Sequence, residues 1–506
     1  MSRLSHHVMA AMLAMAMSVG LAGAQPSGKP VTITFVHLND TAMISPKNGS
    51  GGLAEAYALV KAERQHNKNT IFTFGGDLLS PSILSSQTKG AHMVDLMNAM
   101  KLDMATFGNH EFDFGADVLR QRIQESSFKW VSVNVRGRDG APFGKTVATT
   151  TIKIGGIMVG FLGVTNDEAS IESDPDIRIV SVGDAVRTAV QELKNQGAQV
   201  IVGLTHLHLD EDRALLKANP DIKLILGGYD PDPVAIYENG GLILKSGSDA
   251  QFVGAVDLRI TIARSTNGVE TSIVPSWRII GTAGIAPDPG LAQRIKTYQN
   301  QLDRTLNQAI ATIDGDLDSR HDDVRTRETS MGDVVTDALL ARSKADVALV
   351  DGGSISGDAL YKSGTRLTRR DVLKELPLGN VLVIVELSGK NLAAALENGV
   401  SKLEEKDDRF PQVAGLSFTY DPQRPAGQRI VEIKVGGQEL DPNTTYRIAT
   451  TDFLLQGGDG YDVFKGGKVV LGPGSGPLIA VVVADYIAAQ SKLTAKTESR
   501  ITVLGH

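Results

Sequence analysis

The sequence contains no cysteine among its 506 residues. Disulfides, thiolate nucleophiles and cysteine-ligated zinc or iron–sulfur centres are therefore excluded. A surplus of positive charge is missing too, because 58 acidic residues outnumber 51 basic ones and the net charge is −7. This balance, without a prominent run of lysine or arginine, argues against nucleic acid or an anionic membrane surface as the main partner.

Long apolar runs are also scarce, and the one at the N-terminus has the form of a targeting segment. A weakly basic start with Arg3 precedes the apolar residues 8–21, and the small residues 22–24 supply a cleavage site. We therefore predict that residues 1–24 form a signal peptide. The apolar run is short for a membrane span, so we expect no integral membrane segment in the mature chain. The mature protein is expected to be periplasmic or secreted.

Strand-like and helix-like segments alternate through the rest of the first half. This alternation predicts an α/β fold (α+β layered) with a largely parallel sheet. The expected strands cover residues 31–38, 71–74, 104–107, 130–135 and 200–204, a hairpin turn is expected at residues 155–156, and the expected helices cover residues 53–67, 89–100 and 182–196.

The stretch from Phe107 to Gly115 places three polar groups directly after one of these strands. Asn109 offers an amide oxygen that can bind a divalent cation. His110 can face a substrate oxygen, and Asp113, three residues on, can fix its tautomer and keep it protonated. The alternative interpretation is a polar loop whose carboxylate caps the next helix.

Polar side chains follow four of the expected strands at the point where each strand ends. They are Asp40, Asp77, Asn109 and His206. Taken singly, each is explained by turn formation or by ordinary packing. In open α/β sheets, however, ligands collect at the carboxyl ends of the strands. Four such endings together predict a divalent metal site.

These motifs resemble those of calcineurin-like metallophosphoesterases. The resemblance rests on Asn39-Asp40, Gly76-Asp77, the run from Gly108 to Gly115, and Thr205-His206, in this order. The longer central run and the expected export resemble the 5′-nucleotidase branch, which includes the periplasmic UDP-sugar hydrolases.

The resemblance implies a role for each of these residues. Asp77 would bridge two metals, Asp40 would bind the first, and Asn109 and His206 would bind the second. His110 and Asp113 would form the catalytic pair that stabilises charge on the phosphate. The implied cofactor is one or two divalent ions of manganese, zinc, magnesium or cobalt.

The chain departs from the family pattern at two metal-binding positions. The family has a histidine two residues after the first aspartate, and this chain has Ala42. The family also has a Gly-Gly-His-x-His or Gly-Gly-His-x-Gln motif, whereas here Gly227-Gly228 leads to Tyr229-Asp230-Pro231. Asp230, Asp232 or the Tyr229 phenol could replace the missing ligands, or this strand end is only a turn.

The second half begins with a connector and continues as a second α/β region. Apolar residues at helical spacing predict one amphipathic helix over residues 288–310. A capping box of Ser330 and Asp333 predicts a helix to residue 343, and a strand is expected over residues 345–350. The resemblance implies that residues 26–286 form a metallophosphoesterase-type domain, a β-sandwich flanked by helices. Residues 287–312 would form the connector helix, and residues 313–506 a 5′-nucleotidase-type C-terminal α/β domain.

The resemblance continues through this second region and implies a nucleotide-binding site. In the family, a base lies between two aromatic rings, with arginines and an aspartate nearby. Phe453 matches one ring, Arg325 one arginine and Asp459 the aspartate. Leu378 stands where the second ring is expected, and Ser356 stands where another arginine is expected.

Three functions remain open from the sequence. The first is an exported, metal-dependent phosphoester hydrolase that acts on nucleotides or nucleotide sugars, and the intact pair of His110 and Asp113 favours it. The second is a catalytically impaired nucleotide- or ligand-binding protein on the same fold, favoured by the substitutions at Ala42 and Tyr229. The third is a scaffold that docks on an envelope partner.

Overall fold

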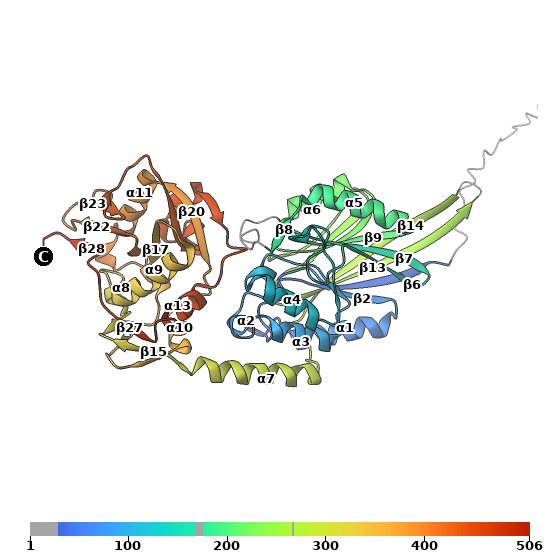
Figure 1. Ribbon diagram of the computed structural model, residues 1–506, viewed down its shortest axis with the longest axis horizontal. Helices are drawn as coiled ribbons and strands as arrows, with labels where there is room; N and C mark the ends of the chain where they lie inside the picture. Colours follow the sequence, from blue (N-terminus) through green and yellow to red (C-terminus); the bar gives the residue numbers. More distant parts are fainter. Residues whose placement is uncertain (1–28, 167–175, 266–267, 506) are drawn as a thin grey trace, which may run out of the picture.

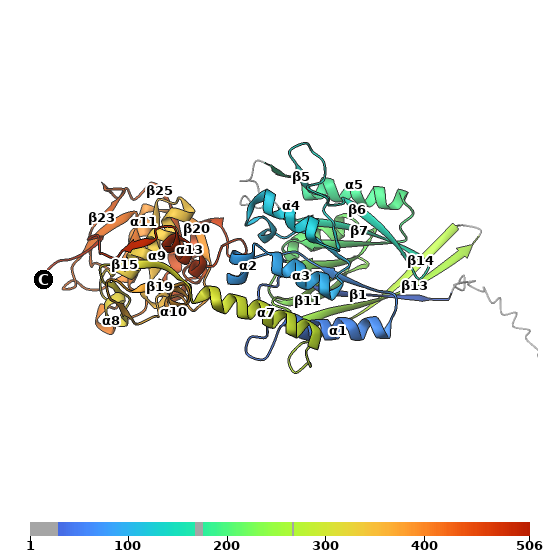
Figure 2. The same ribbon diagram turned by 60° about the horizontal axis from the view of Figure 1, so that its bottom comes forward.

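The computed structural model describes residues 29–166, 176–265 and 268–505. The predicted signal peptide, residues 1–24, lies outside these ranges. Two α/β domains lie end to end along the long axis, as Figure 1 shows. The long helix α7 (Pro289–Leu306) runs from the N-terminal domain to the C-terminal domain in both views (Figures 1 and 2). It contacts α1 and α3 at one end and α10 at the other.

The N-terminal domain is built on two six-stranded sheets, ordered β14-β13-β1-β2-β3-β4 and β11-β12-β10-β9-β7-β6. Strands β1 to β4 are parallel, as are β7, β9, β10 and β12, while the strands at the edges pair antiparallel. The first sheet consists of β1 (Val31–Leu38), β2 (Thr70–Phe74), β3 (Met104–Ala105), β4 (Lys129–Trp130), β13 (Phe252–Ser265) and β14 (Gly268–Gly281). The second consists of β6 (Thr149–Ile154), β7 (Ile157–Thr165), β9 (Val200–His206), β10 (Ile222–Gly228), β11 (Pro233–Glu238) and β12 (Gly241–Ser246).

Helices cover the outer face of each sheet, so the domain has four layers (Figure 1). Apolar side chains of both sheets fill the space between them, including Phe35, Phe161 and Leu224. Helices α5 and α6 pack on the second sheet, and α1, α3 and α4 pack on the first. The helices are α1 (Leu53–His66), α2 (Ile83–Thr88), α3 (Ala91–Met100), α4 (Gly115–Glu125), α5 (Val182–Asn195) and α6 (Leu209–Ala218).

The strand register brings the carboxyl ends of the central strands to one edge. Leu38 of β1 pairs with Phe74 of β2, and Phe74 pairs with Ala105 of β3. In the second sheet, His206 of β9 pairs with Gly228 of β10. Because both sheets end at this edge, residues that follow their strands share one site.

The C-terminal domain has a central mixed sheet ordered β21-β17-β25-β20-β26 and three smaller sheets. These are β24-β23-β22-β28, β19-β15-β27, and the pair of β16 (Leu317–Asp318) with β18 (Leu360–Tyr361). Helices α9, α10 and α13 pack on one face of the central sheet, and α11 packs on the other. Its main strands are β15 (Ala309–Asp314), β17 (Val347–Asp351), β19 (Arg366–Thr368), β20 (Leu382–Ser388), β21 (Pro411–Ala414), β22 (Leu416–Tyr420), β23 (Ile430–Val435), β24 (Gln438–Glu439), β25 (Thr445–Thr451), β26 (Lys468–Leu471), β27 (Lys492–Thr494) and β28 (Ile501–Val503). Its helices are α8 (His321–Val324), α9 (Ser330–Ser343), α10 (Arg369–Glu375), α11 (Gly389–Gly399), α12 (Asp452–Leu455) and α13 (Ile479–Ala488).

The α/β fold class predicted from the sequence is confirmed, and three local predictions are wrong. The strand expected over residues 130–135 is interrupted between β4 and β5 (Val135–Gly137). The helix expected to reach residue 310 ends at Leu306, because Ile310 belongs to β15, which pairs with β19 and β27. The cap of α9 is Thr329, whose hydroxyl accepts from the Gly332 N–H, rather than Ser330. Among the described residues, no helix is both long and apolar enough to cross a membrane.

Candidate metal centre

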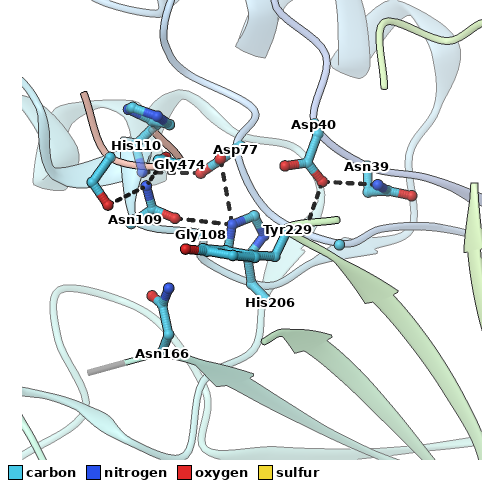
Figure 3. Close-up of polar contacts among 12 residues, drawn as sticks. Asn39, Asp40, Asp77, Gly108, Asn109, His110, Asn166, His206, Tyr229 and Gly474 are labelled. Carbon is cyan, nitrogen blue, oxygen red and sulfur yellow. Dashed lines mark hydrogen bonds and ion pairs between the residues drawn. The ribbon is translucent and has the colours of Figure 1, made fainter. Parts of the chain in front are cut away.

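Three of the four predicted strand-end ligands form a compact group at the shared edge of the two sheets (Figure 3). One ligand atom each from Asp40, Asp77 and His206 lies within 4.8 Å of the others. Among the described residues this is the one cluster of at least three histidine or acidic side chains with such spacing. Asn109 joins it, because its Oδ1 lies 3.1 Å from Nε2 of His206.

The orientation of the His206 ring suits a metal ligand. Its Nδ1 lies 2.8 Å from the carbonyl oxygen of Gly75 and must donate to it, because a carbonyl only accepts. Nε2 then faces Oδ2 of Asp77 at 3.4 Å and the Asn109 oxygen. Burial lowers the pKa of His206, but Asp77 and Asp40 outweigh it and raise the pKa to about 10. Positive charge is therefore favoured where Nε2 meets the two oxygens, and the donors N, O and O fit a divalent ion there.

The two aspartates lie in the turns after β1 and β2 and are held there by hydrogen bonds. Both adopt a positive φ, 48° for Asp40 and 58° for Asp77. Asp40 Oδ2 accepts from the Asn39 side-chain amide at 2.8 Å and from the Tyr229 backbone N–H at 2.9 Å. Burial, with a smaller contribution from the neighbouring Asp77, outweighs the opposing charge of His206 and raises the pKa of Asp40 to about 7. For Asp77 the burial effect is outweighed by His206 and His110, so its pKa is lowered.

Glu111 is a site residue that sequence reasoning missed. Its buried carboxylate accepts four backbone N–H groups, from Gly108 at 2.5 Å, Asp77 at 2.9 Å, Leu78 at 2.6 Å and Leu79 at 3.0 Å. It thereby fixes the turn that carries Asp77 against the turn that carries Asn109. Burial, together with the nearby charge of Asp77, raises the pKa of Glu111 to about 7. Its position inside the predicted motif was the only available signal.

His110 and Asp113 lie beside this group and contact each other. Nδ1 of His110 is 2.9 Å from Oδ2 of Asp113, and the His110 N–H donates to Asp77 Oδ1 at 2.9 Å. Burial alone lowers the pKa of His110, but Asp113 and Asp77 outweigh it and raise the pKa to about 10. The ring is therefore protonated near neutral pH and can donate from Nε2 to an anion.

The positions that depart from the family pattern are engaged in other contacts. The Ala42 N–H donates to Asp249 Oδ1 at 3.0 Å. Asp230, one of the suggested replacement ligands, is instead paired at 2.5 Å with the buried ammonium of Lys245. Asp232, another suggested replacement, is exposed and outside the cluster. The Tyr229 ring lies edge-on to His206, with centroids 5.5 Å apart, and Figure 3 shows it alongside the cluster.

The C-terminal domain reaches this centre through one loop. The Asn109 side-chain amide donates to the Gly474 carbonyl at 2.7 Å, and Ser475 Oγ lies 3.3 Å away. These bonds turn the Asn109 oxygen towards His206. Ser475 belongs to the loop between β26 and α13, so the two domains meet at a predicted metal ligand.

The predicted substrate-binding residues lie elsewhere in the C-terminal domain. Phe453 is 41% exposed. Its ring packs closely on Gly458, since a Cβ there would lie 2.5 Å from it. Asp459 is the residue after Gly458, and the positive charge of the Arg325 guanidinium acts on the Asp459 carboxylate. Arg325 is itself paired with Asp408 at 2.5 Å. None of the three predicted residues lines the cavity that contains Asn109 and Asp113.

Comparison with known proteins identifies both halves of the chain. Residues 33–228 match the model of the calcineurin-like phosphoesterases, and residues 309–466 match the 5′-nucleotidase C-terminal domain. The chain is 30% identical over 482 residues to the trifunctional nucleotide phosphoesterase protein YfkN of Bacillus subtilis, covering 85% of this chain but only 32% of that relative. It is 27% identical over 551 residues to silent protein UshA(0) of Salmonella typhimurium, covering 96% of each.

A solved structure supports the same assignment. The 5′-nucleotidase precursor from Thermus thermophilus is 28% identical, with a TM-score of 0.54, over 94% of this chain and 100% of that one. The family resemblance predicted from the motifs is thus confirmed. The chain belongs to the calcineurin-like phosphoesterases that carry a 5′-nucleotidase C-terminal domain, a family of phosphoric ester hydrolases.

Proposed function

We propose that this chain is an exported, metal-dependent hydrolase that releases phosphate from nucleotides. The observation that carries the proposal is the meeting of Asp77 Oδ2, Asn109 Oδ1 and His206 Nε2 at one buried point. Residues 26–286 would carry the chemistry, residues 287–312 would connect the domains, and residues 313–506 would bind the organic part of the substrate. Export rests on the predicted signal peptide.

In this proposal the chain's own side chains hold the metal and the phosphate. Asp77, Asn109 and His206 would bind one divalent ion, and Asp40 with Asp77 would bind a second. When bound, such ions supply an activated water and neutralise the phosphate oxygens. His110, kept protonated by Asp113, would donate to a phosphate oxygen and stabilise the charge that develops there.

The donor set also bears on the choice of metal. Carboxylate and amide oxygens with one imidazole suit manganese, zinc, magnesium or cobalt. The second ion would have fewer ligands, because Ala42 offers none and Asp230 is paired with Lys245. We therefore expect nearer one tightly held metal per chain than two.

The nucleotide substrate is proposed from the names of the relatives and from the C-terminal residues. YfkN is a nucleotide phosphoesterase, and the Thermus thermophilus precursor is a 5′-nucleotidase. Phe453 could stack on a base, while Arg325 and Asp459 could bind its polar groups. Arg325 would have to exchange its bond to Asp408 for one to the ligand.

A second function is favoured by one specific observation. Tyr229 stands where the family has a histidine, and its ring packs beside His206. A chain so altered could bind a nucleotide without hydrolysing it at a useful rate.

One experiment separates the two functions. Purified protein is analysed for bound metal and then assayed with AMP and UDP-glucose, with added manganese or zinc and with a chelator. The hydrolase predicts turnover that disappears with the chelator and returns with metal. Nucleotide binding without turnover by the metal-loaded protein would contradict the hydrolase and support the binding protein.

A further inference from the structure

Lys245 is a buried lysine close to the metal centre, and its ammonium has a complete set of partners. The residue lies on β12, and its side chain is fully buried. Nζ donates to the carbonyl oxygens of Leu207 at 2.6 Å and Gly228 at 2.8 Å. It also lies 2.5 Å from Oδ2 of Asp230 and 2.9 Å from Oδ2 of Asp212. A charge this deep in the domain is tolerated because four oxygens replace its hydration shell.

Two of these contacts reach the strand ends that form the metal centre. Leu207 directly follows His206, so the ammonium holds the chain one residue past this predicted ligand. Gly228 ends β10, and a Cβ placed on it would lie 2.8 Å from Oδ2 of Asp40 and 2.9 Å from Nδ1 of His206. Lys245 therefore ties β12 to β9 and β10 at the point where two predicted ligands meet.

The Gly228–Tyr229 peptide group connects Lys245 to Asp40. A trans peptide is planar, so its C=O and N–H point in opposite directions and turn together. The carbonyl of this peptide accepts from Lys245 at 2.8 Å, and its N–H donates to Oδ2 of Asp40 at 2.9 Å (Figure 3). Figure 3 shows the other oxygen of Asp40 turned towards Asp77. The ammonium thus fixes the peptide group that orients the Asp40 carboxylate.

The backbone of Tyr229 is in a conformation that needs such support. Its φ is 79°, which is costly for a residue with a Cβ and persists only where the surroundings hold it. The bond from Lys245 to the preceding carbonyl is charge-assisted, and such bonds are stronger than those between neutral groups. Without the ammonium, the peptide group could turn and take its N–H away from Asp40.

We propose that Lys245 is a positioning residue of the metal centre, which holds Asp40 through the Gly228–Tyr229 peptide group and thereby sets the affinity for the second metal ion. The inference rests on the proposed function, in which Asp40 and Asp77 bind that ion. Outer partners of metal ligands typically contribute about 10- to 100-fold to metal affinity, and we expect an effect of this size. The first ion does not use Asp40, so its affinity should change much less.

The absence of native cysteine makes a chemical rescue possible. Lys245→Cys is unfolded in denaturant, alkylated with 2-bromoethylamine and refolded, which returns an ammonium at the length of the lysine side chain. Calorimetric titration with manganese then measures both binding steps, with wild type carried through the same treatment as the reference. The affinity of the weaker step should fall about 10- to 100-fold in unalkylated Lys245→Cys and recover on alkylation, while the tighter step changes little. General damage to the fold would weaken both steps.

Two further variants locate the effect and guard against misfolding. Lys194→Cys, carried through the same treatment, removes an exposed ammonium that pairs with Asp221, and both binding steps should stay unchanged. If Lys245→Cys does not refold, the triple variant Lys245→Met/Asp212→Asn/Asp230→Asn removes the buried charges together and leaves no carboxylate unpaired. It should show the same loss at the weaker step.

The possible failures are distinguishable. Equal affinity of the weaker step with and without the ammonium would overturn the proposal, and so would a wild type that binds only one ion at millimolar manganese. A wild type that binds manganese but hydrolyses neither AMP nor UDP-glucose would contradict the proposed function, while the two binding steps would still decide the role of Lys245. A wild type that binds no manganese would contradict both.

Discussion

The two domains differ in how far their predicted functional residues are already arranged for use. In the N-terminal domain, Asp77, Asn109 and His206 are buried and meet at one point. In the C-terminal domain, Phe453 is 41% exposed and Arg325 is paired with Asp408. The chemical centre is preorganised in this structure, whereas the residues predicted to bind a base are not.

The difference follows from the elements that carry the residues. Strand ends in a packed sandwich have fixed positions, and Glu111 ties two of them together through four backbone N–H groups. Phe453 and Asp459 instead lie on short helical turns after β25. Preorganised donors cost no reorganisation during the reaction, which matters most where charge develops. Substitutions in the centre should therefore affect turnover, and substitutions around Phe453 should affect binding.

The largest effect is expected at His110. His110→Ala should lower turnover about 10²- to 10⁴-fold, the usual contribution of such a histidine, while metal content stays unchanged. Asp113→Asn should act in the same direction but less, because it disturbs the ring without removing it. Steady-state hydrolysis and elemental analysis on the same samples measure both quantities. Equal turnover of the wild type and His110→Ala would show that the arranged centre is not catalytic.

The next effect comes from restoring the two missing ligands. Ala42→His and Tyr229→His together should add a second metal, because each returns an imidazole to the edge of the cluster. Tyr229 already adopts φ 79°, a region that histidine enters more readily than most residues. We expect the affinity for the second ion to rise at least about 10-fold, since even outer partners of metal ligands contribute that much.

Metal titration of the wild type, both single variants and the double variant measures this effect. Each single variant should raise the affinity for the second ion less than the double variant does, because it returns one ligand rather than two. If the wild type already holds two metals through dialysis, the present residues are a working ligand set and the repair hypothesis is wrong.

Much of the fold was predictable from local pattern, and the failures have physical causes. Apolar runs that end in Asp40, Asp77 and His206 predicted the strands. The pattern of buried side chains is written in each segment's own sequence, so no distant contact was needed to recognise it. Ile310 keeps helical spacing, yet long-range pairing of β15 with β19 and β27 overrides it. The role of Glu111 could not be inferred from residue spacing, because it acts on backbone N–H groups.

Contacts between segments far apart in the sequence could not be predicted, for a related reason. The bond from Asn109 to Gly474 joins residues 365 positions apart, and nothing in either segment specifies the other. The Lys245 pair with Asp230 likewise depends on how β10 and β12 pack. The sequence could propose Asp230 as a ligand but could not show that a buried ammonium holds it.

A smaller effect should distinguish the C-terminal binding residues from the centre. Phe453→Ala should raise KM for AMP about 10-fold with little change in kcat, because stacking on one ring contributes about 1–3 kcal/mol. Leu378 is 63% exposed and stands where the family has the second ring. Leu378→Phe should therefore lower the KM for AMP, because it supplies that ring. Steady-state kinetics separates KM from kcat. A fall in kcat with unchanged KM in Phe453→Ala would contradict the division of roles.

The smallest expected effect concerns acid sensitivity and the buried His92 of the N-terminal domain. Burial lowers the pKa of His92 to about 3, against an ordinary value of 6.5. The folded state therefore binds fewer protons than the unfolded state below pH 6.5, and stability falls as the pH drops through 6.5 towards 3. Between pH 8 and pH 6 the loss should be about 1 kcal/mol. His92→Phe keeps a ring against Tyr298 but cannot be protonated, so it should lose less stability over this range.

Several other buried groups decide how the acid sensitivity of His92 has to be measured. Asp40 and Glu111, whose pKa values burial raises to about 7, change stability over the same range with the opposite sign. So do His110 and His206, whose pKa values neighbouring carboxylates raise to about 10. His37, whose pKa burial lowers to about 4, changes it with the same sign as His92. The wild-type profile alone cannot isolate His92 for that reason. The deciding quantity is the difference in the free energy of unfolding between His92→Phe and the wild type, measured by denaturant at pH 8 and pH 6. If that difference is the same at both pH values, His92 does not contribute to the acid sensitivity of the domain.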